Sequence, residues 1–285
     1  MKNGMCPEEN RKAVTLKEAV SWGRAELEKN GVEEAALDAW YLLEHVTGVS
    51  RAAYYAYPET EMTAEQESGY RDLVQRRGRH IPLQHLTGTQ EFMGLEFQVN
   101  EHVLIPRQDT ETLCEAALDF LRGREAPRVL DLCAGSGAIG LSLAKLCPDA
   151  RVTLVDISAG ACAVMAENRR RLDVKAEVVC GDLFAPVRGQ KFDLIACNPP
   201  YIRTGELDAL QADVQKEPRL ALDGGADGLD FYRRIAGEYK NYLATGGSLM
   251  LETGWDEAGS VQALFGGGSV LRDLGGHDRV IAIRE

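Results

Sequence analysis

The stretch Val129-Leu130-Asp131-Leu132-Cys133-Ala134-Gly135-Ser136-Gly137-Ala138-Ile139-Gly140 decides the fold of this 285-residue chain. An apolar run leads into a glycine-rich turn, and the turn leads into a segment with helical spacing. Gly135, Gly137 and Gly140 match the pattern G-x-G-x-x-G, whose glycines let the backbone turn sharply and approach a ligand closely. The stretch therefore predicts a strand, a ligand-binding turn and a helix, which together open a doubly wound α/β sheet.

The sequence after residue 128 alternates between short apolar runs and longer segments with helical periodicity. This alternation is typical of a parallel sheet whose strands are connected by helices. The tail departs from it, because residues 270–274 and 279–283 flank Gly275-Gly276-His277 and predict an antiparallel hairpin. The predicted strands are 129–132, 152–155, 176–179, 194–197 and 248–252, and the predicted helices are 137–146, 161–172 and 231–242.

Residues 15–80 instead predict a small bundle of helices with its own core. Two of these helices begin at capping boxes, Thr15-Leu16-Lys17-Glu18 and Thr63-Ala64-Glu65-Gln66. A third periodic run extends from Ala35 to Val46.

Between these two parts, the alternating stretch 90–100 and the apolar stretch 103–106 predict a β-hairpin that turns around Asn100-Glu101-His102. We interpret this hairpin as the connection between domains, and residues 110–121 as the first helix after it. The predicted domains are a helical domain (1–85), a hairpin linker (86–108) and an α/β domain (109–285).

The composition narrows the classes of function. The net charge of −12 disfavours nucleic acid as a partner, because such affinity comes largely from neutralising phosphates. The one basic cluster, Arg76-Arg77-Gly78-Arg79-His80, is interpreted as a solvated helix end. The chain has no apolar run of about 18 residues, and its first residues lack the apolar core of a signal peptide. Seven cysteines without a C-x-x-C pair indicate reduced thiols, so we expect a cytoplasmic protein. The five histidines are scattered and none pairs with a cysteine at ligand spacing, so we expect no metal site. The Glu, Lys, Asn and Arg content of residues 1–12 predicts a loosely ordered tail.

The most informative motif for function is Asn198-Pro199-Pro200-Tyr201, which follows the apolar run 192–197. Neither proline has a backbone N–H and each has a fixed φ, so the strand must end there in a rigid loop. In an open α/β sheet, ligands bind at this end of the strands. The loop carries an amide oxygen, a free proline carbonyl and an aromatic ring, which suit the binding of a planar NH2 group. The alternative is a strand that ends at prolines beside a surface tyrosine.

The glycine pattern leaves two nucleotide cofactors open, because Asp156 at the end of the next strand suits the ribose of either NAD or S-adenosylmethionine. Three features favour S-adenosylmethionine. Asp131 lies inside the strand before the turn, where it can approach an ammonium group, although it can also cap N–H groups of the loop itself. Gly181-Asp182-Leu183-Phe184 follows the third strand, where it can flank an adenine. The loop after the fourth strand is not required for hydride transfer.

These motifs resemble those of class I S-adenosylmethionine-dependent methyltransferases. More narrowly, they are similar to those of the PrmC/HemK family, the protein-glutamine N5-methyltransferases that modify peptide chain release factors. The resemblance covers nearly the whole chain, including the stretches 92–97, 104–112 and 217–229. It implies a Rossmann-like methyltransferase sheet, S-adenosylmethionine as cofactor, and methylation of the glutamine in a release factor's Gly-Gly-Gln motif. It further implies that the N-terminal helices hold the release factor, without a membrane and without direct nucleic-acid binding.

The resemblance also implies the site residues. Asn198 and the Pro199 carbonyl would each accept one N–H of the substrate amide, and Tyr201 would stack on the amide or form a wall of the pocket. Glu217-Pro218-Arg219 is expected near the substrate entrance, or else as a turn with an ion pair. The implied catalytic residues are Asn198, Pro199, Pro200 and Tyr201, and the implied cofactor-binding residues are Asp131, Cys133, Ala134, Gly135, Ser136, Gly137, Asp156, Ile157, Asp182, Leu183 and Asn198.

The chain departs from the family's pattern in three places, which are the glycine turn, residue 108 and residue 183. Cys133-Ala134-Gly135-Ser136-Gly137 stands where Gly-Thr-Gly-Thr-Gly is common, which keeps two glycines and places a thiol beside the cofactor. Gln108 replaces a common proline. Leu183 replaces a residue that is aromatic in some members, so stacking on adenine is expected to be weaker or to come from Phe184.

Three other functions remain open at this point. An amino-methyltransferase acting on rRNA or DNA would use nearly the same chemistry, because an exocyclic amine also presents a planar NH2 group. An NAD-dependent oxidoreductase is favoured by the glycine pattern alone. A methyltransferase-like binding module without turnover is disfavoured by the intact Asn198 loop.

Overall fold

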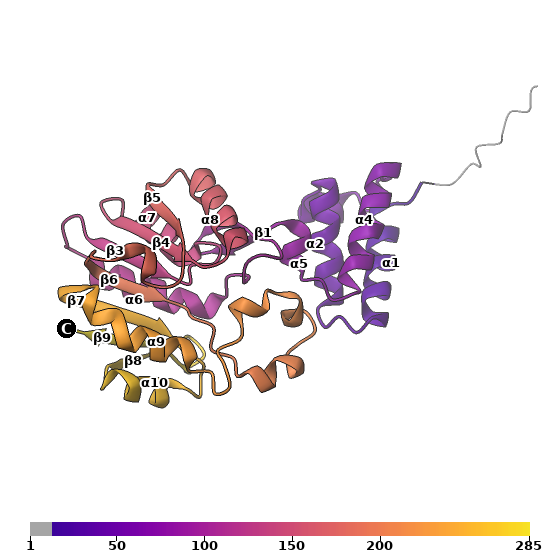
Figure 1. The fold of residues 1–285 in the computed structure, drawn as a ribbon. Coiled ribbons are helices and arrows are strands. Elements are labelled where there is room, and N and C mark those ends of the chain that lie inside the picture. The colour runs from indigo at the N-terminus through magenta and orange to yellow at the C-terminus, as the bar shows by residue number, and fades with distance from the viewer. Residues whose placement is uncertain (1–12) are drawn as a thin grey trace, which may run out of the picture. The chain divides into compact units, whose positions relative to one another are not determined.

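The computed structural model describes residues 13–285, which form two compact units, residues 13–87 and residues 88–285 (Figure 1). The predicted loose tail at residues 1–12, together with Cys6, lies outside the described part. Of the predicted hairpin linker (86–108), residues 88–108 lie within the second unit and residues 86–87 within the first.

The first unit is helical. Its capping boxes form as predicted, with the Thr15 and Thr63 side chains each accepting a hydrogen bond from the backbone three residues later. The three helices predicted from periodicity are confirmed. Two short helices of six and five residues were not predicted, because so few residues show no periodic pattern. The helices are α1 (Leu16–Lys29), α2 (Ala35–Thr47), α3 (Arg51–Ala56), α4 (Ala64–Arg77) and α5 (Leu83–Thr87).

The basic cluster at the end of α4 is not uniformly exposed. The Arg77 side chain is only 7% exposed, and its Nε donates to Asp38 Oδ2 of α2 at 2.6 Å. A buried guanidinium requires such a partner, because an unpaired charge loses its hydration. The interpretation of this cluster as a solvated helix end is therefore wrong for Arg77, which is a structural residue.

The core of the first unit depends on a close approach of α1 to Tyr70 of α4. A Cβ added at Gly23 would lie 2.0 Å from the Tyr70 hydroxyl oxygen, and that hydroxyl donates to the Ala39 carbonyl at 3.1 Å. We expect Gly23→Ala to lower the free energy of unfolding by about 1–3 kcal/mol through overpacking. The matched control is Gly69→Ala in α4, where the nearest atom would lie at 3.8 Å and helix propensity predicts a gain of up to about 1 kcal/mol. Urea unfolding measures both, and equal effects would contradict this packing.

The second unit contains a seven-stranded sheet in the order β5-β4-β3-β6-β7-β9-β8. The first five of these strands are parallel, whereas β9 runs antiparallel to both β7 and β8. This arrangement confirms the predicted doubly wound sheet and its terminal antiparallel hairpin. The strands of the sheet are β3 (Arg128–Leu132), β4 (Arg151–Asp156), β5 (Ala176–Cys180), β6 (Phe192–Cys197), β7 (Leu243–Glu252), β8 (Ser269–Arg272) and β9 (Asp278–Arg284).

Helices cover both faces of this sheet (Figure 1). Val129 of β3 packs into a core shared with α6, α7 and α8, whereas the neighbouring Leu130 packs into a core shared with α9 and α10. This alternation follows from the period of two along a strand. The helix α10 was not predicted. The helices are α6 (Glu111–Leu121), α7 (Ala138–Leu146), α8 (Ala159–Leu172), α9 (Asp230–Glu238) and α10 (Ala258–Phe265).

The first hairpin is displaced from its predicted position. Its strands are β1 (Thr89–Phe92) and β2 (Leu95–Gln98), so the chain turns at Met93-Gly94 and not around residues 100–102. Met93 and Gly94 both have positive φ, 52° and 71°, as a tight two-residue hairpin turn requires. The prediction was wrong because it followed polar residues and overlooked the glycine. The stretch 103–106 is buried in part but forms no strand.

No helix within residues 13–285 combines the length and apolar character needed to cross a bilayer.

Candidate active site

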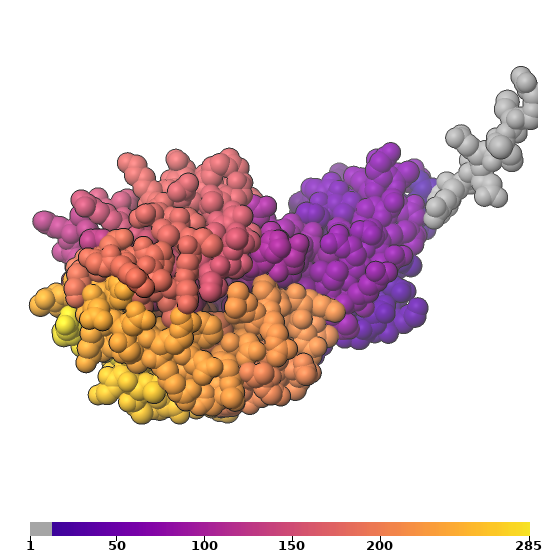
Figure 2. All heavy atoms as spheres, viewed as in Figure 1, coloured from indigo at the N-terminus to yellow at the C-terminus, as the bar shows by residue number. Residues whose placement is uncertain are grey.

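The carboxyl ends of β3, β4, β5 and β6 surround one cavity of about 290 Å³. The strand order reverses at β3, because β4 and β5 lie on one side of it and β6 and β7 lie on the other. Open α/β sheets bind their ligands at such a reversal. In Figure 2, residues of the 160–185 region border those of the 200–235 region, and both regions contribute residues to the lining. Of the predicted site residues, those that line the cavity are Cys133, Ala134, Gly135, Ser136, Asp156, Ile157, Asp182, Leu183, Asn198 and Pro200.

The glycine turn after β3 forms one side of the cavity. Cys133, Gly135 and Gly137 all have positive φ, and a Cβ added at Gly135 would meet no atom within 4 Å. Gly135 thus leaves its backbone open to a ligand. Gly137 serves packing instead, because a Cβ there would lie 2.7 Å from Met165, and Gly137 is not part of the lining.

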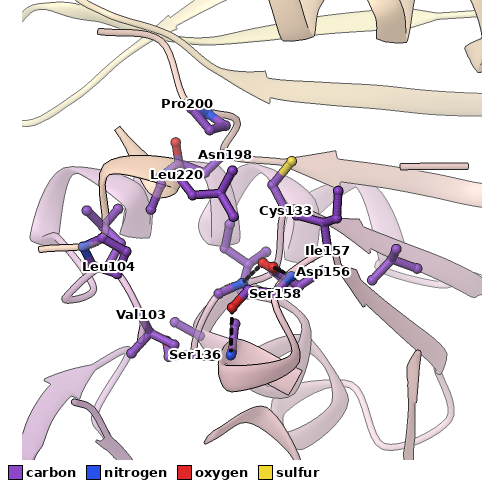
Figure 3. Close-up of a pocket in the computed structure, with 18 of the residues that line it drawn as sticks. Val103, Leu104, Cys133, Ser136, Asp156, Ile157, Ser158, Asn198, Pro200 and Leu220 are labelled. Atoms are coloured by element: carbon purple, nitrogen blue, oxygen red, sulfur yellow. Dashed lines mark hydrogen bonds between the residues drawn. The ribbon is translucent and has the colours of Figure 1, made fainter. Parts of the chain in front are cut away.

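Asp156 at the end of β4 connects the glycine turn to Ser158, the residue that precedes α8 (Figure 3). Its Oδ2 accepts from the Gly135 N–H and its Oδ1 accepts from the Ser158 N–H, both at 2.8 Å. Burial raises the pKa of Asp156, whereas the hydrogen bonds from Ser158, Gly135 and Ile157 oppose the rise. Each carboxylate oxygen has a further lone pair, so Asp156 can accept hydroxyl groups from a ligand while it holds the glycine turn.

Asp131 lies behind the turn and does not line the cavity. Its side chain is fully buried, and Oδ2 accepts from the Gly140 N–H of α7 at 2.8 Å. Oδ1 has no hydrogen-bond partner within residues 13–285. Burial raises the pKa of Asp131 to about 7, although the Gly140 hydrogen bond acts in the opposite direction. The structure thus shows Asp131 as a cap of the loop, and a contact with a ligand ammonium stays a prediction.

The buried Asp131 carboxyl makes the free energy of unfolding of the cofactor-free protein depend on pH. The pKa of Asp131 is about 7 in the folded protein and 3.8 ordinarily, so between these values the folded state binds the proton more tightly. The free energy of unfolding must therefore contain a component that falls as pH rises, by at most about 1.4 kcal/mol per pH unit. We expect Asp131→Asn to gain stability relative to the parent protein between pH 4 and 7. Urea unfolding at several pH values measures this, and parallel curves would contradict it.

The loop after β6 places Asn198 and Pro200 at the cavity (Figure 3). The Asn198 Nδ2 donates to Thr110 Oγ1 at 3.4 Å. Pro199 and Tyr201 are not among the lining residues. Burial and the Glu252 carboxylate raise the pKa of Tyr201, so the phenol stays protonated near neutral pH. The loop is tightly packed, since a Cβ at Gly224 would lie 2.7 Å from the Tyr201 Cα.

The segment after β5 places its two apolar side chains differently. Leu183, at φ 45°, lines the cavity, whereas Phe184 is 1% exposed and stacks on Tyr242 with ring centroids 4.4 Å apart. The expectation that Phe184 supplies stacking on adenine is therefore wrong, because this ring belongs to the core between the sheet and α9. Leu183 is the side chain available for that contact. Asp182 beside it pairs with Arg234 of α9 at 2.6 Å.

Glu217 and Pro218 agree with both expectations for residues 217–219, which were a position near the substrate entrance and a turn with an ion pair. Glu217 is buried, accepts from the Ile105 N–H at 2.9 Å and forms an ion pair with Arg107, while Pro218 lines the cavity. The sequence did not identify Thr110 and Arg107 as part of the cavity, although both lie in the stretch 104–112 that carries the family resemblance. Further lining residues that were not predicted are His102, Val103, Leu104, Pro106, Ser158, Leu220, Phe231 and Arg234.

The fold and the cavity define this chain as a class I S-adenosylmethionine-dependent methyltransferase. The family description "Methyltransferase small domain" matches residues 110–226. Among solved structures, a Thermus thermophilus 16S rRNA N2 G1207 methyltransferase in complex with AdoMet and guanosine is similar in fold, with a TM-score of 0.50 and 22% identity over 69% of this chain and 49% of that chain.

Within that class, the description "PrmC N-terminal domain" matches residues 18–88. Relatives named release factor glutamine methyltransferase align over nearly their full length. The Geobacter sulfurreducens protein is 43% identical over 95% of this chain and 96% of its own. The Moorella thermoacetica protein is 43% identical over 93% and 97%, and the Caulobacter vibrioides protein is 37% identical over 94% and 96%. The chain belongs to the release factor glutamine methyltransferase family.

Proposed function

We propose that this chain transfers a methyl group from S-adenosylmethionine to the side-chain amide nitrogen of the glutamine in the Gly-Gly-Gln motif of peptide chain release factors. The observation that carries the proposal is the meeting of the glycine turn and the Asn198 loop in one cavity. The names of the full-length relatives support glutamine as the acceptor and not an exocyclic amine of rRNA or DNA.

The residues present fit S-adenosylmethionine. The open backbone at Gly135, the carboxylate of Asp156 and the apolar side chain of Leu183 would hold its amino acid part, ribose and adenine in turn. When bound, this cofactor supplies an electrophilic methyl group on a sulfonium centre. Cys133 also lines the cavity, so its thiol would lie beside the bound cofactor.

The Asn198 loop would supply catalysis by positioning. A carboxamide nitrogen is a poor nucleophile, because its lone pair is delocalised into the carbonyl group. Asn198 Oδ1 and the Pro199 carbonyl would each accept one N–H, which favours positive charge on the nitrogen and directs its lone pair. Holding reacting atoms about 3–3.5 Å apart in this way lowers a barrier by several kcal/mol. Tyr201, kept as a neutral phenol, would support the loop.

The helices of residues 13–87 would bind the release factor away from the chemistry. We expect a protein lacking residues 1–87 to show a KM for the release factor raised by an order of magnitude or more, since much of the contact area with the substrate is lost. Cofactor affinity should change little, because the lining residues that the structure describes all belong to the second unit. Calorimetry with the cofactor and initial rates with the release factor measure the two effects. Equal loss of both would indicate a structural role.

The acceptor class is tested with labelled S-adenosylmethionine and three substrates, namely a purified release factor, ribosomal RNA and duplex DNA. We expect label in the release factor alone, and mass spectrometry should locate it on a glutamine side chain. Label in RNA or DNA, with binding that falls steeply as salt increases, would favour the base-modifying alternative. This proposal places the reaction in the cytoplasm, where release factors act.

A further inference from the structure

We propose that Glu217 is a positioning residue that makes the cavity selective for an uncharged carboxamide, because it neutralises the charge of Arg107 in the cavity wall. The inference deepens the proposed function and rests on it, since the acceptor there is a glutamine and the side chain to be excluded is a glutamate. The sequence predicted an ion pair in this stretch as one possibility, without its partner or its consequence for the acceptor.

Glu217 joins two segments of the cavity wall that lie 110 residues apart along the chain. Its side chain is 1% exposed, its Oε2 accepts from the Ile105 N–H at 2.9 Å, and its Oε1 accepts from the guanidinium of Arg107. A buried carboxylate needs such donors, because they replace its lost hydration. The Arg107 side chain is 40% exposed and lines the cavity. The pair therefore has its carboxylate behind the wall and its guanidinium at the cavity.

Both segments contact the loop after β6. On one side, the Thr110 N–H donates to the Arg107 carbonyl at 3.1 Å, and Thr110 Oγ1 accepts from Asn198 Nδ2 at 3.4 Å. On the other side, the Ile202 N–H, directly after the motif, donates to the Leu222 carbonyl at 3.0 Å. The ion pair is thus attached at both ends to the loop that would hold the acceptor amide.

The same two segments make this part of the wall largely apolar. Figure 3 shows Leu104 and Leu220 around the cavity together with Asn198. An ionised carboxylate that entered here would lose its hydration and would need an unpaired cation in return. A carboxamide carries no net charge and enters at a lower cost. The other apolar lining residues of these segments are Pro106, Pro218 and Ala221.

Two arginines are among the described residues that line the cavity, and each is paired with a carboxylate. Arg107 pairs with Glu217, and Arg234 of α9 pairs with Asp182 at 2.6 Å. Glutamine and glutamate side chains have nearly the same shape and differ chiefly in charge, so shape alone cannot distinguish them. Neutralising the guanidinium removes the attraction that a glutamate would otherwise find near Asn198, and specificity can rest on such a removal.

The test compares how the full-length protein binds two release factors, one with its Gly-Gly-Gln motif and one with that glutamine changed to glutamate. Calorimetry with S-adenosylhomocysteine, the demethylated cofactor, measures both dissociation constants without turnover. The selectivity is the dissociation constant of the glutamate form divided by that of the glutamine form. We expect Glu217→Gln to lower the selectivity about tenfold, because it keeps an acceptor for the Ile105 N–H but leaves the Arg107 charge unbalanced.

The same argument predicts the opposite change when the cation is removed. Arg107→Gln leaves the Glu217 charge unbalanced and should raise the selectivity about tenfold. The double variant restores neutrality and should return the selectivity to its parental value. The matched control is Asp193→Asn, because Asp193 also accepts from a backbone N–H, that of Arg128 at 2.8 Å, and pairs with Arg124 at 3.9 Å. Neither partner lines the cavity, so the selectivity should not change.

The outcomes separate this inference from the proposed function. If neither release factor binds the parent protein, the proposed acceptor is wrong and the inference falls with it. If the glutamine form binds and is methylated, but the selectivity is the same in all variants, Glu217 only holds the wall together and the neutralising role is overturned. Equal binding of both forms by the parent protein would also overturn it. If Glu217→Gln does not fold, the partly exposed Arg107 decides, and Arg107→Gln with unchanged or lowered selectivity would contradict the inference.

Discussion

Asn198→Ala is expected to lower kcat for methyl transfer by about 10²–10³, the usual cost of losing one preorganised hydrogen bond where charge develops. The residue lies at the rigid loop after β6 and lines the cavity. In the proposed mechanism its amide oxygen accepts the substrate N–H, so the reacting nitrogen would lose both its alignment and its stabilisation. S-adenosylmethionine binding should survive in part, because the glycine turn and Asp156 are unchanged. Single-turnover kinetics and cofactor calorimetry measure the two quantities.

The control for this variant is Asn241→Ala, which removes an exposed asparagine outside the cavity lining. It should leave both kcat and cofactor affinity unchanged. Asn198→Ala with a normal kcat would show that the loop does not act through this amide, and the mechanism would have to be abandoned.

Asp156→Ala is expected to weaken S-adenosylmethionine binding by at least about 100-fold. Two hydrogen bonds from ribose hydroxyls to a charged group contribute about 1.5–3 kcal/mol each, and the variant also releases the Gly135 N–H from its acceptor. Cofactor titration measures the dissociation constant. At saturating cofactor, kcat should recover much of its parent value, because the Asn198 loop stays in place.

The matched control is Asp193→Ala, in which an aspartate also accepts from a backbone N–H, that of Arg128 at 2.8 Å, but does not line the cavity. This variant should bind the cofactor as the parent protein does. If Asp156→Ala retained parental affinity, the assignment of the ribose to Asp156 would be wrong.

The sheet and its loops were predictable because their signals are local. The glycine turn after β3 and the prolines after β6 each act within a few residues, and the structure confirms the strands that they were predicted to end. The first hairpin was misplaced because its tight turn at Met93-Gly94 competes with a more polar stretch a few residues later. The short helices α3 and α5 were not predicted, because so few residues show no periodic pattern.

The cavity was only partly predictable, because several of its parts depend on tertiary contacts. Phe184 and Leu183 are neighbours in the sequence, and only packing against Tyr242 decides which one lines the cavity. Thr110 and Asn198 lie far apart along the chain, and the Asn198 side chain donates to Thr110 because the start of α6 packs beside β6. No spacing rule indicates such a contact.

The measurement that tests the central claim most directly is methyl transfer from labelled S-adenosylmethionine to a purified release factor, beside the same release factor with the glutamine of its Gly-Gly-Gln motif changed to alanine. We predict label on the unchanged release factor alone, which would establish the activity and the acceptor together. Absence of label from both, with the cofactor shown to bind, would contradict the proposed acceptor. Equal label on both would place the methyl group at another residue.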